Sequence, residues 1–234
     1  MLNLDRSTWK THRFGELVRN SNESVKNVAD RGIEHLIALE HLDPGEITLS
    51  RYGRVADGTT FTRRVRPGQT LFGKRRAYQR KAAYVEVDAI CSGDILVFEA
   101  IPDRMSPRLL PFLVHSEAFF DHTLGTSAGS LSPRTSWKAL ADFEVALPEI
   151  DEQERGLRTP GRGGEQATPL AKLLRRLGIE QLGHRVGHRL WVARLDGQAG
   201  AGLGEGRGPA GLVVGPQGLA RDEDRGDGGA EEFV

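Results

Sequence analysis

The sequence predicts a mixed α/β domain of the α+β type, with a twisted mixed sheet and a few helices, over residues 1–155. Short β-type runs bounded by turn residues occupy residues 33–100, and helix-type apolar spacing follows from residue 107. A series of strands followed by helices is typical of such mixed domains. After residue 155 glycine and arginine dominate, which predicts a largely disordered Gly/Arg-rich tail over residues 156–234.

The predicted strands are short apolar or alternating runs between turn residues, and they cover residues 33–39, 46–50, 59–65, 70–72, 83–90 and 94–100. The turns between them are rich in glycine, proline and small polar residues, as in Asp43-Pro44-Gly45, Arg66-Pro67-Gly68 and Cys91-Ser92-Gly93. The last two strands, 83–90 and 94–100, have the clearest pattern.

A helix is predicted from Ser106-Pro107 to Gly125, because an apolar face recurs through Leu109, Phe112, Leu113, Phe119, Phe120 and Leu124. A shorter helix at 137–141 precedes a last strand at 143–147. Residues 151–155 begin another helix.

Composition excludes several classes of protein. Lysine plus arginine and aspartate plus glutamate each number 32, so the formal net charge is zero. The single cysteine, Cys91, excludes an internal disulfide framework and a cysteine-rich zinc site, and a reducing cytoplasm is the expected location. No run approaches the roughly 18 apolar residues of a membrane span. No signal peptide opens the chain, so we expect no membrane partner.

The tail has too little apolar mass to offset its chain entropy, since residues 151–234 hold 19 of the 29 glycines. One short amphipathic helix is predicted over 168–178, but the sequence offers no core for its leucines, Leu170, Leu173, Leu174 and Leu177. The composition is equally typical of a GC-rich gene read out of frame, so a frameshift product stays an open alternative.

A basic stretch from residue 58 to residue 85 contains no acidic residue and interleaves cations with aromatic side chains. Its cations are Arg63, Arg64, Arg66, Lys74, Arg75, Arg76, Arg80 and Lys81. A local positive surface of this kind suits a phosphate backbone, and arginine suits guanine edges. The alternative is that these side chains are solvated strand faces whose acidic partners come from elsewhere in the fold.

A second polar segment, residues 125–135, combines glycines with small hydroxyl side chains and ends near Arg134. Backbone N–H groups exposed in such a loop can bind phosphates. The alternative is an ordinary connection between two helices.

An ordered series of short motifs resembles a known family. The series comprises Phe14-Gly15-Glu16-Leu17-Val18, Leu39-Glu40-His41-Leu42-Asp43, Leu71-Phe72-Gly73-Lys74-Arg75-Arg76-Ala77-Tyr78, Ile90-Cys91-Ser92-Gly93-Asp94-Ile95-Leu96-Val97, Gly125-Thr126-Ser127-Ala128-Gly129-Ser130 and Phe143-Glu144-Val145-Ala146-Leu147-Pro148, leading into Asp151-Glu152-Gln153-Glu154. Over about residues 9–155 it resembles a target recognition domain from the specificity subunit of a type I restriction–modification system.

The resemblance implies sequence-specific binding of double-stranded DNA without catalysis. It implies a methyltransferase subunit as partner, a restriction subunit in the full complex, and self-association if one domain serves both half-sites. S-adenosylmethionine, ATP and magnesium are then expected on those partner subunits, and no cofactor on this chain. The family continues after a segment like 147–154 with a long helix. That helix is expected to be broken here by Gly156, Pro160, Gly161, Gly163 and Gly164, which puts assembly in doubt.

Motifs of enzymes are missing from the sequence. The only Asp-Pro pair, Asp43-Pro44, continues with glycine, unlike the motif that holds a flipped base in adenine methyltransferases. Gly73-Lys74 lacks the spacing and hydroxyl of a phosphate loop. His184 and His188 have no evident third metal ligand. We therefore expect neither a catalytic site nor a metal site.

The residues expected to contact DNA come from both polar segments and from the turn after residue 50. They are first Lys74, Arg75, Arg76 and Tyr78, and then Arg51, Arg80, Lys81, Ser127, Ser130 and Arg134. Two alternatives remain open: a truncated interaction module that binds the methyltransferase without useful DNA recognition, and an inactive remnant.

Overall fold

The computed structural model describes residues 6–129, 132–157 and 173–174. In chain order the described elements are β1 (Lys10–Arg13), α1 (Phe14–Leu17), β2 (Val18–Asn20), β3 (His35–Ile37), β4 (Gly53–Arg54), β5 (Arg63–Val65), β6 (Thr70–Gly73), β7 (Ala82–Tyr84), β8 (Ala89–Cys91), β9 (Ile95–Ala100), α2 (Leu110–Val114), α3 (Glu117–Thr126), α4 (Trp137–Ala141), β10 (Glu144–Leu147) and α5 (Ile150–Leu157). Four 3₁₀ turns join them, at Val28–Arg31, Leu39–His41, Val55–Asp57 and Ala77–Gln79.

The strands of the described residues form three small sheets. One is antiparallel with the order β2-β9-β6-β7, and one is mixed with the order β4-β3-β8-β5, where β3 and β8 run parallel. The third pairs β1 with β10, so the two ends of the domain close against each other. The predicted mixed α+β class is confirmed, with three sheets in place of a single twisted one.

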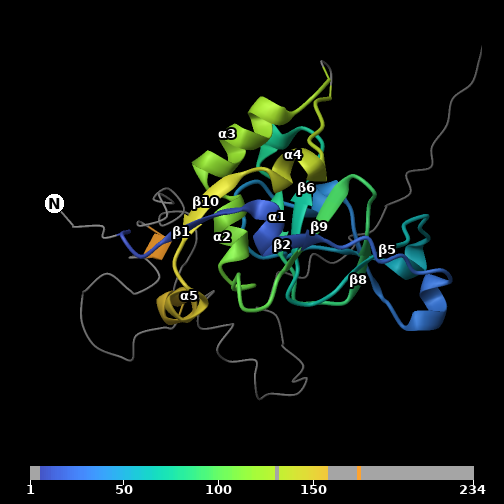
Figure 1. The fold of residues 1–234 in the computed structure, drawn as a ribbon. Coiled ribbons are helices and arrows are strands. Elements are labelled where there is room, and N and C mark those ends of the chain that lie inside the picture. The colour runs from blue at the N-terminus through green and yellow to red at the C-terminus, as the bar shows by residue number, and fades with distance from the viewer. Residues whose placement is uncertain (1–5, 130–131, 158–172, 175–234) are drawn as a thin grey trace, which may run out of the picture. The chain divides into compact units, whose positions relative to one another are not determined.

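The central strands β6 and β9 are buried on both faces, because the helices cover one face and the mixed sheet covers the other (Figure 1). Along β9, Ile95 and Val97 face the core shared with the mixed sheet, whereas Leu96 and Phe98 face the helices. Side chains alternate between the two faces of a strand, so one continuous apolar run supplies both cores.

The core on the helix side is aromatic. Phe14, Phe72, Phe98 and Phe119 are almost completely buried there, and neighbouring ring centroids lie 5.0–5.7 Å apart. Ring pairs at this spacing add stability beyond their buried area. This core fixes α1 and α3 against the β2-β9-β6-β7 sheet.

Several predicted elements have different limits in the structure. The run 83–90 is divided between β7 and β8, which lie in different sheets. Residues 46–50 form no strand and contribute one bridge, between Thr48 and Tyr84. The helix predicted over 107–124 is two helices, because the Ser116 hydroxyl accepts the Phe119 N–H and caps a new helix there. Helix α4 spans the predicted residues 137–141.

His115 lies buried at the junction of α2 and α3. Its Nε2 lies 3.1 Å from the Glu46 carbonyl oxygen and 2.9 Å from the Ala82 carbonyl oxygen, so a neutral ring donates to both. Burial lowers the pKa of the imidazole below its ordinary value. This side chain therefore stabilises the fold in its neutral form.

We expect the free energy of unfolding to fall as the pH drops below about 6.5, the ordinary histidine pKa, because the unfolded chain then binds a proton that folded His115 resists. A histidine with a lowered pKa stabilises above that pH and loses its contribution below it. His115→Gln keeps a donor without a titrating group, so urea unfolding at pH 7 and pH 5.5 should show a flatter dependence. An unchanged dependence would contradict this assignment.

Helix α5 runs through Gly156 to Leu157, so Gly156 itself does not break the helix as expected, and the other expected helix breakers, from Pro160 to Gly164, lie outside the described residues. Gly156 is buried against Leu173, and a Cβ at position 156 would lie 2.5 Å from the Leu173 Cδ2. Leu173 and Leu174 are helical and belong to the main core. The expectation that this part of the tail has no core is therefore wrong for these two leucines. The rest of the predicted helix 168–178, and the predicted disorder of the tail, lie outside the described residues.

Gly156→Val is expected to lower the free energy of unfolding by about 1–3 kcal/mol, because the added carbons overpack the contact with Leu173. Urea unfolding measures this change. Gly93→Ala is the matched control, since a Cβ there meets no atom within 4 Å and its backbone is not left-handed. Equal stability of the two variants would show that Leu173 does not pack against α5.

Candidate nucleic-acid interface

The hairpin between β6 and β7 carries the centre of the basic stretch, residues 74–81. Its tip is the 3₁₀ turn Ala77–Gln79, flanked by Arg76 and Arg80 in the left-handed conformation at φ +50° and +51°. Ala77 is buried and anchors the turn, whereas the Tyr78 side chain is 55% exposed. The hairpin therefore presents an aromatic ring and a cation at its tip.

The hydroxyl-rich loop after α3 lies directly against this hairpin. The Arg76 N–H donates to the Pro133 carbonyl at 2.9 Å, and the Thr135 N–H donates to the Lys74 carbonyl at 3.0 Å. Isolated bridges join Arg134 to Arg75 and to Ala128. Two segments predicted independently from the sequence are thus one surface.

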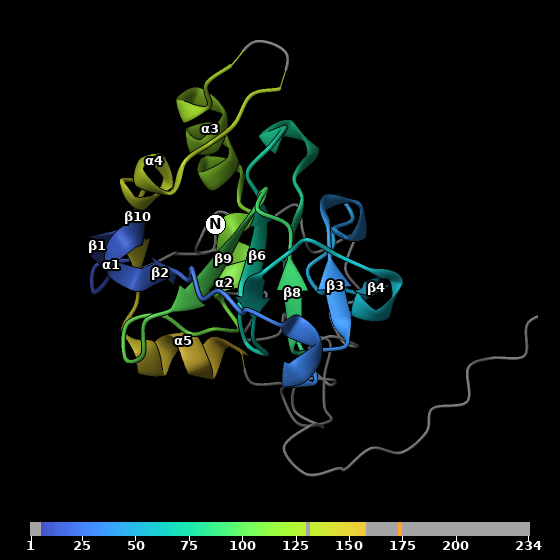
Figure 2. The same ribbon diagram turned by 90° about the vertical axis from the view of Figure 1, so that its right-hand side faces the viewer.

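A third segment, residues 39–51, borders the C-terminal side of the hairpin, at Arg80 and Lys81. The Gly45 N–H donates to the Arg80 carbonyl at 3.3 Å, and the Lys81 Nζ donates to the Leu39 carbonyl at 2.7 Å. We call residues 39–51, 74–81, 127–129 and 132–135 the three-loop surface. The hairpin and the loop after α3 lie at the end of the domain opposite α5 (Figures 1 and 2).

Acidic residues from elsewhere in the fold neutralise part of the basic stretch. Arg64 pairs with Asp88 at 2.5 Å, Arg66 pairs with Glu23 at 2.8 Å, and Arg80 pairs with Glu117. Hydrogen bonds from Arg66 and Arg80 lower the pKa values of Glu23 and Glu117, respectively. For these three arginines the alternative interpretation is therefore correct: they lie on solvated faces and pair with acidic residues from other elements.

The cations at the root and tip of the hairpin have a different environment. Within the described part of the chain, Lys74 and Arg76 form no ion pair, and Arg76 is exposed. Arg75 and Arg134 share a single carboxylate, Asp94, at 3.0 and 3.5 Å. These four cations and Asp94 together carry a net charge of +3. Lys81, whose Nζ donates to the Leu39 carbonyl, likewise forms no ion pair among the described residues.

Other predicted contact residues are held by the protein itself. Arg51 forms a bidentate pair with Asp43, at 3.0 and 2.5 Å, and also donates to the Glu40 carbonyl. The Arg80 guanidinium lies over the Phe120 ring at 4.7 Å. The Ser127 hydroxyl donates to the Thr123 carbonyl at 2.7 Å. These side chains stabilise the three-loop surface, and Ser130 lies outside the described residues.

Sequence reasoning missed Asp94, the acidic residue that pairs with both loops. Gly73 of β6 is paired with Ile95 of β9, and this register places Asp94 beside Lys74. No local pattern in the sequence announces that pairing. Ser132 was also missed, and its hydroxyl lies 3.4 Å from the Arg75 Nε.

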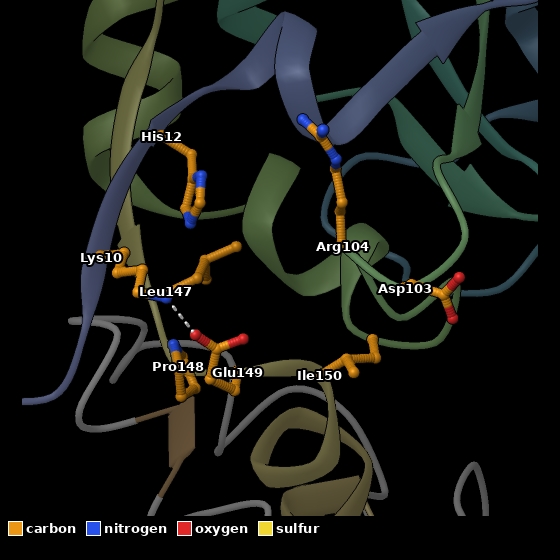
Figure 3. Close-up of a pocket in the computed structure, with 8 residues that line it drawn as sticks. All are labelled: Lys10, His12, Asp103, Arg104, Leu147, Pro148, Glu149 and Ile150. Carbon is orange, nitrogen blue, oxygen red and sulfur yellow. Dashed lines mark hydrogen bonds and ion pairs between the residues drawn. The ribbon is translucent and has the colours of Figure 1, made fainter.

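A small cavity of about 120 Å³ lies at the other end of the domain, where β10 leads into α5 (Figure 3). Lys10 and Glu149 form an ion pair of 2.6 Å at its edge, and His12 and Arg104 line it. Ligand pockets usually measure about 300–1,000 Å³, so this cavity is too small for a nucleotide cofactor.

A wider open groove of about 840 Å³ lies beside β3 and β4, where the ring centroids of Tyr52 and His35 lie 4.2 Å apart with the ring planes tilted by 45°. Among the described residues no group of three His, Cys, Asp or Glu side chains could hold a metal ion. No helix in the described ranges has the length and apolar character needed to cross a membrane.

Comparison with known proteins gives a match in structure. No protein-family model matches the chain, and no curated protein matches its sequence. The HsdS subunit from Thermoanaerobacter tengcongensis is similar in structure with a TM-score of 0.55 and 18% identity, over 64% of this chain and 40% of that chain. Over the matched residues, the chain has the fold of part of an HsdS specificity subunit.

A second solved structure supports the same fold. Its subject is complex assembly and conformational transition of the type I restriction–modification system, and the TM-score is 0.54 at 18% identity, over 63% of this chain and 40% of that chain. This chain therefore spans about two-fifths of the length of the HsdS-like chains that it matches. The family resemblance inferred from the ordered motifs is confirmed at the level of fold.

Proposed function

We propose that this chain recognises a DNA sequence as the specificity subunit of a type I restriction–modification system. It catalyses nothing itself and directs methyltransferase and restriction subunits to their DNA site in the cytoplasm. The observation that carries the proposal is the three-loop surface, with its excess of positive charge, on an HsdS-like fold. S-adenosylmethionine, ATP and magnesium act on the partner subunits, and this chain holds no cofactor.

The shape of the β6–β7 hairpin supports recognition through the major groove. That groove is about 12 Å wide and admits a two-stranded β-ribbon. Arg76 at the hairpin tip has the two donors that match guanine O6 and N7, and the exposed Tyr78 ring lies next to it. Lys74 and Arg134 lie nearer the root, where phosphates flank the groove. Bases are thus contacted by the tip and the backbone by the root.

The recognition domain comprises residues 1–155, as the sequence indicates, and Gly156, Leu157, Leu173 and Leu174 complete its main core. One such domain reads one half-site. Two copies of the chain would read a palindromic site, because a twofold dimer presents the same surface twice.

Sequencing the methylated bases of cells that co-express the chain with its methyltransferase subunit tests the proposal. New adenine methylation at one defined motif is expected, and it should disappear without the chain. A palindromic motif would indicate two copies acting together. Absence of new methylation, despite co-purification of the two subunits, would contradict the proposal as a whole.

One observation favours the second candidate, a module that binds the methyltransferase without useful DNA recognition. Arg64, Arg66 and Arg80 are already neutralised by acidic side chains, so they add little to DNA affinity. Co-purification that is unaffected by nuclease treatment, together with no DNA affinity of the chain, would establish that module instead.

A further inference from the structure

Asp94 is fixed in place at the start of β9. Its N–H donates to the Ser92 hydroxyl at 3.2 Å, and its carbonyl oxygen accepts the Lys74 N–H at 3.0 Å. The pairing of Gly73 with Ile95 continues the β6–β9 ladder on one side of it. The backbone of Asp94 is therefore held rigidly at the root of the β6–β7 hairpin.

The carboxylate of Asp94 lies between two arginines that come from loops about 60 residues apart in sequence. The Arg75 Nη1 lies 3.0 Å from Oδ2, and the Arg134 Nη2 lies 3.5 Å from Oδ1. Arg75 also donates through Nε to the Ser132 hydroxyl at 3.4 Å. Without this carboxylate, two guanidinium groups would lie close together and repel each other.

We infer that Asp94 is a positioning residue that determines specificity on the three-loop surface. It holds the β6–β7 hairpin and the loop after α3 at one spacing, so that both meet the same stretch of duplex. Its carboxylate also neutralises one positive charge where phosphates would bind, which lowers the affinity for arbitrary DNA. The inference rests on the proposed function, because it concerns the same DNA-binding surface.

An acidic side chain in the middle of a DNA-binding surface opposes binding by charge alone. Its contribution must therefore lie in geometry, and the two effects can be separated. Asp94→Asn keeps the shape of the side chain, removes its charge and releases Arg75 and Arg134. Binding to arbitrary DNA should then strengthen, whereas discrimination between sequences should weaken.

The test compares full-length wild-type, Asp94→Asn and Asp88→Asn chains on two 30-base-pair duplexes. One duplex carries the motif that the wild-type chain enriches from a random library, and the other has a scrambled sequence. Asp88→Asn is the matched control, because it makes the same change of charge in the mixed sheet, where it removes one partner of Arg64 and leaves the pairing of Arg64 with Glu23 at 3.6 Å. Binding is measured from 50 to 200 mM salt.

For Asp94→Asn we expect tighter binding to the scrambled duplex, a salt slope steeper by about 0.9, and a loss of discrimination of about tenfold or more. Asp88→Asn should keep the wild-type discrimination. Asp94→Glu, which retains the negative charge, should keep most of the wild-type discrimination between the two duplexes.

Two results would overturn the inference. Asp94→Asn with unchanged discrimination would show that the carboxylate does not set the geometry. An equal loss of affinity for the motif duplex and for the scrambled duplex, without restoration by Asp94→Glu, would show that Asp94 has a purely structural role. If the wild-type chain enriches no motif, the proposed function fails first, and that result is distinct from either of these.

Discussion

Replacing Lys74 and Arg76 together with alanine is expected to weaken binding to duplex DNA by about 10- to 100-fold near 0.1 M salt, and to reduce the salt slope by about 2. These two cations form no ion pair within the described residues, and under the proposed function their partners are DNA phosphates and base edges. Fluorescence anisotropy with a labelled 30-base-pair duplex, over a series of salt concentrations, measures both quantities.

The matched control is the double substitution Arg64→Ala and Arg66→Ala. It removes the same formal charge from the same basic stretch, but these arginines are paired with Asp88 and Glu23. We expect a much smaller loss of affinity and of salt slope from this control. If the two pairs of substitutions have equal effects, DNA responds only to net charge and the three-loop surface is not the interface.

Phe119→Ala is expected to lower the free energy of unfolding by about 3–5 kcal/mol, a large part of the stability of a domain of this size. The ring is fully buried, and its centroid lies 5.0 Å from that of Phe14, 5.6 Å from that of Phe72 and 5.2 Å from that of Phe143. It therefore joins α3 to α1, to β6 and to the segment before β10. Urea unfolding followed by circular dichroism measures the loss.

Leu124→Ala on the same helix is the control, because that side chain is 45% exposed and should cost little. A similar loss from both variants would place the main core elsewhere.

The loop after α3 begins at Ser127, which closes the end of that helix. Loosening α3 should therefore also weaken DNA binding, through the loop and not through any lost contact of Phe119.

The mixed class and most of the helices could be predicted from the sequence, because helical spacing, capping residues and turn residues are local signals. The division of residues 83–90 between two sheets could not. Apolar residues fill both β7 and β8, so the pattern does not show that one strand pairs with β6 and the other with β3 and β5. Strand β1, with the sequence Lys-Thr-His-Arg, has no apolar alternation, and only its pairing with β10 defines it.

The candidate site shows the same limit. Charge and composition predict which loops carry cations, and the structure places the hairpin and the loop after α3 together. Which cations are neutralised depends on strand register and tertiary packing. Arg80 meets Glu117 only because α3 lies beside the hairpin turn, and Arg75 meets Asp94 only because β6 pairs with β9. Lys74 and Arg76 therefore stand out only once the fold is known.

The most direct test of sequence-specific recognition is selection from a library of random 30-base-pair duplexes with the full chain, followed by sequencing of the bound fraction. We predict enrichment of one defined motif, and we predict that the Lys74→Ala and Arg76→Ala double variant loses it whereas the Arg64→Ala and Arg66→Ala control keeps it. Retention of duplexes without any enriched motif would contradict DNA recognition by this chain and leave only a basic surface on an HsdS-like fold.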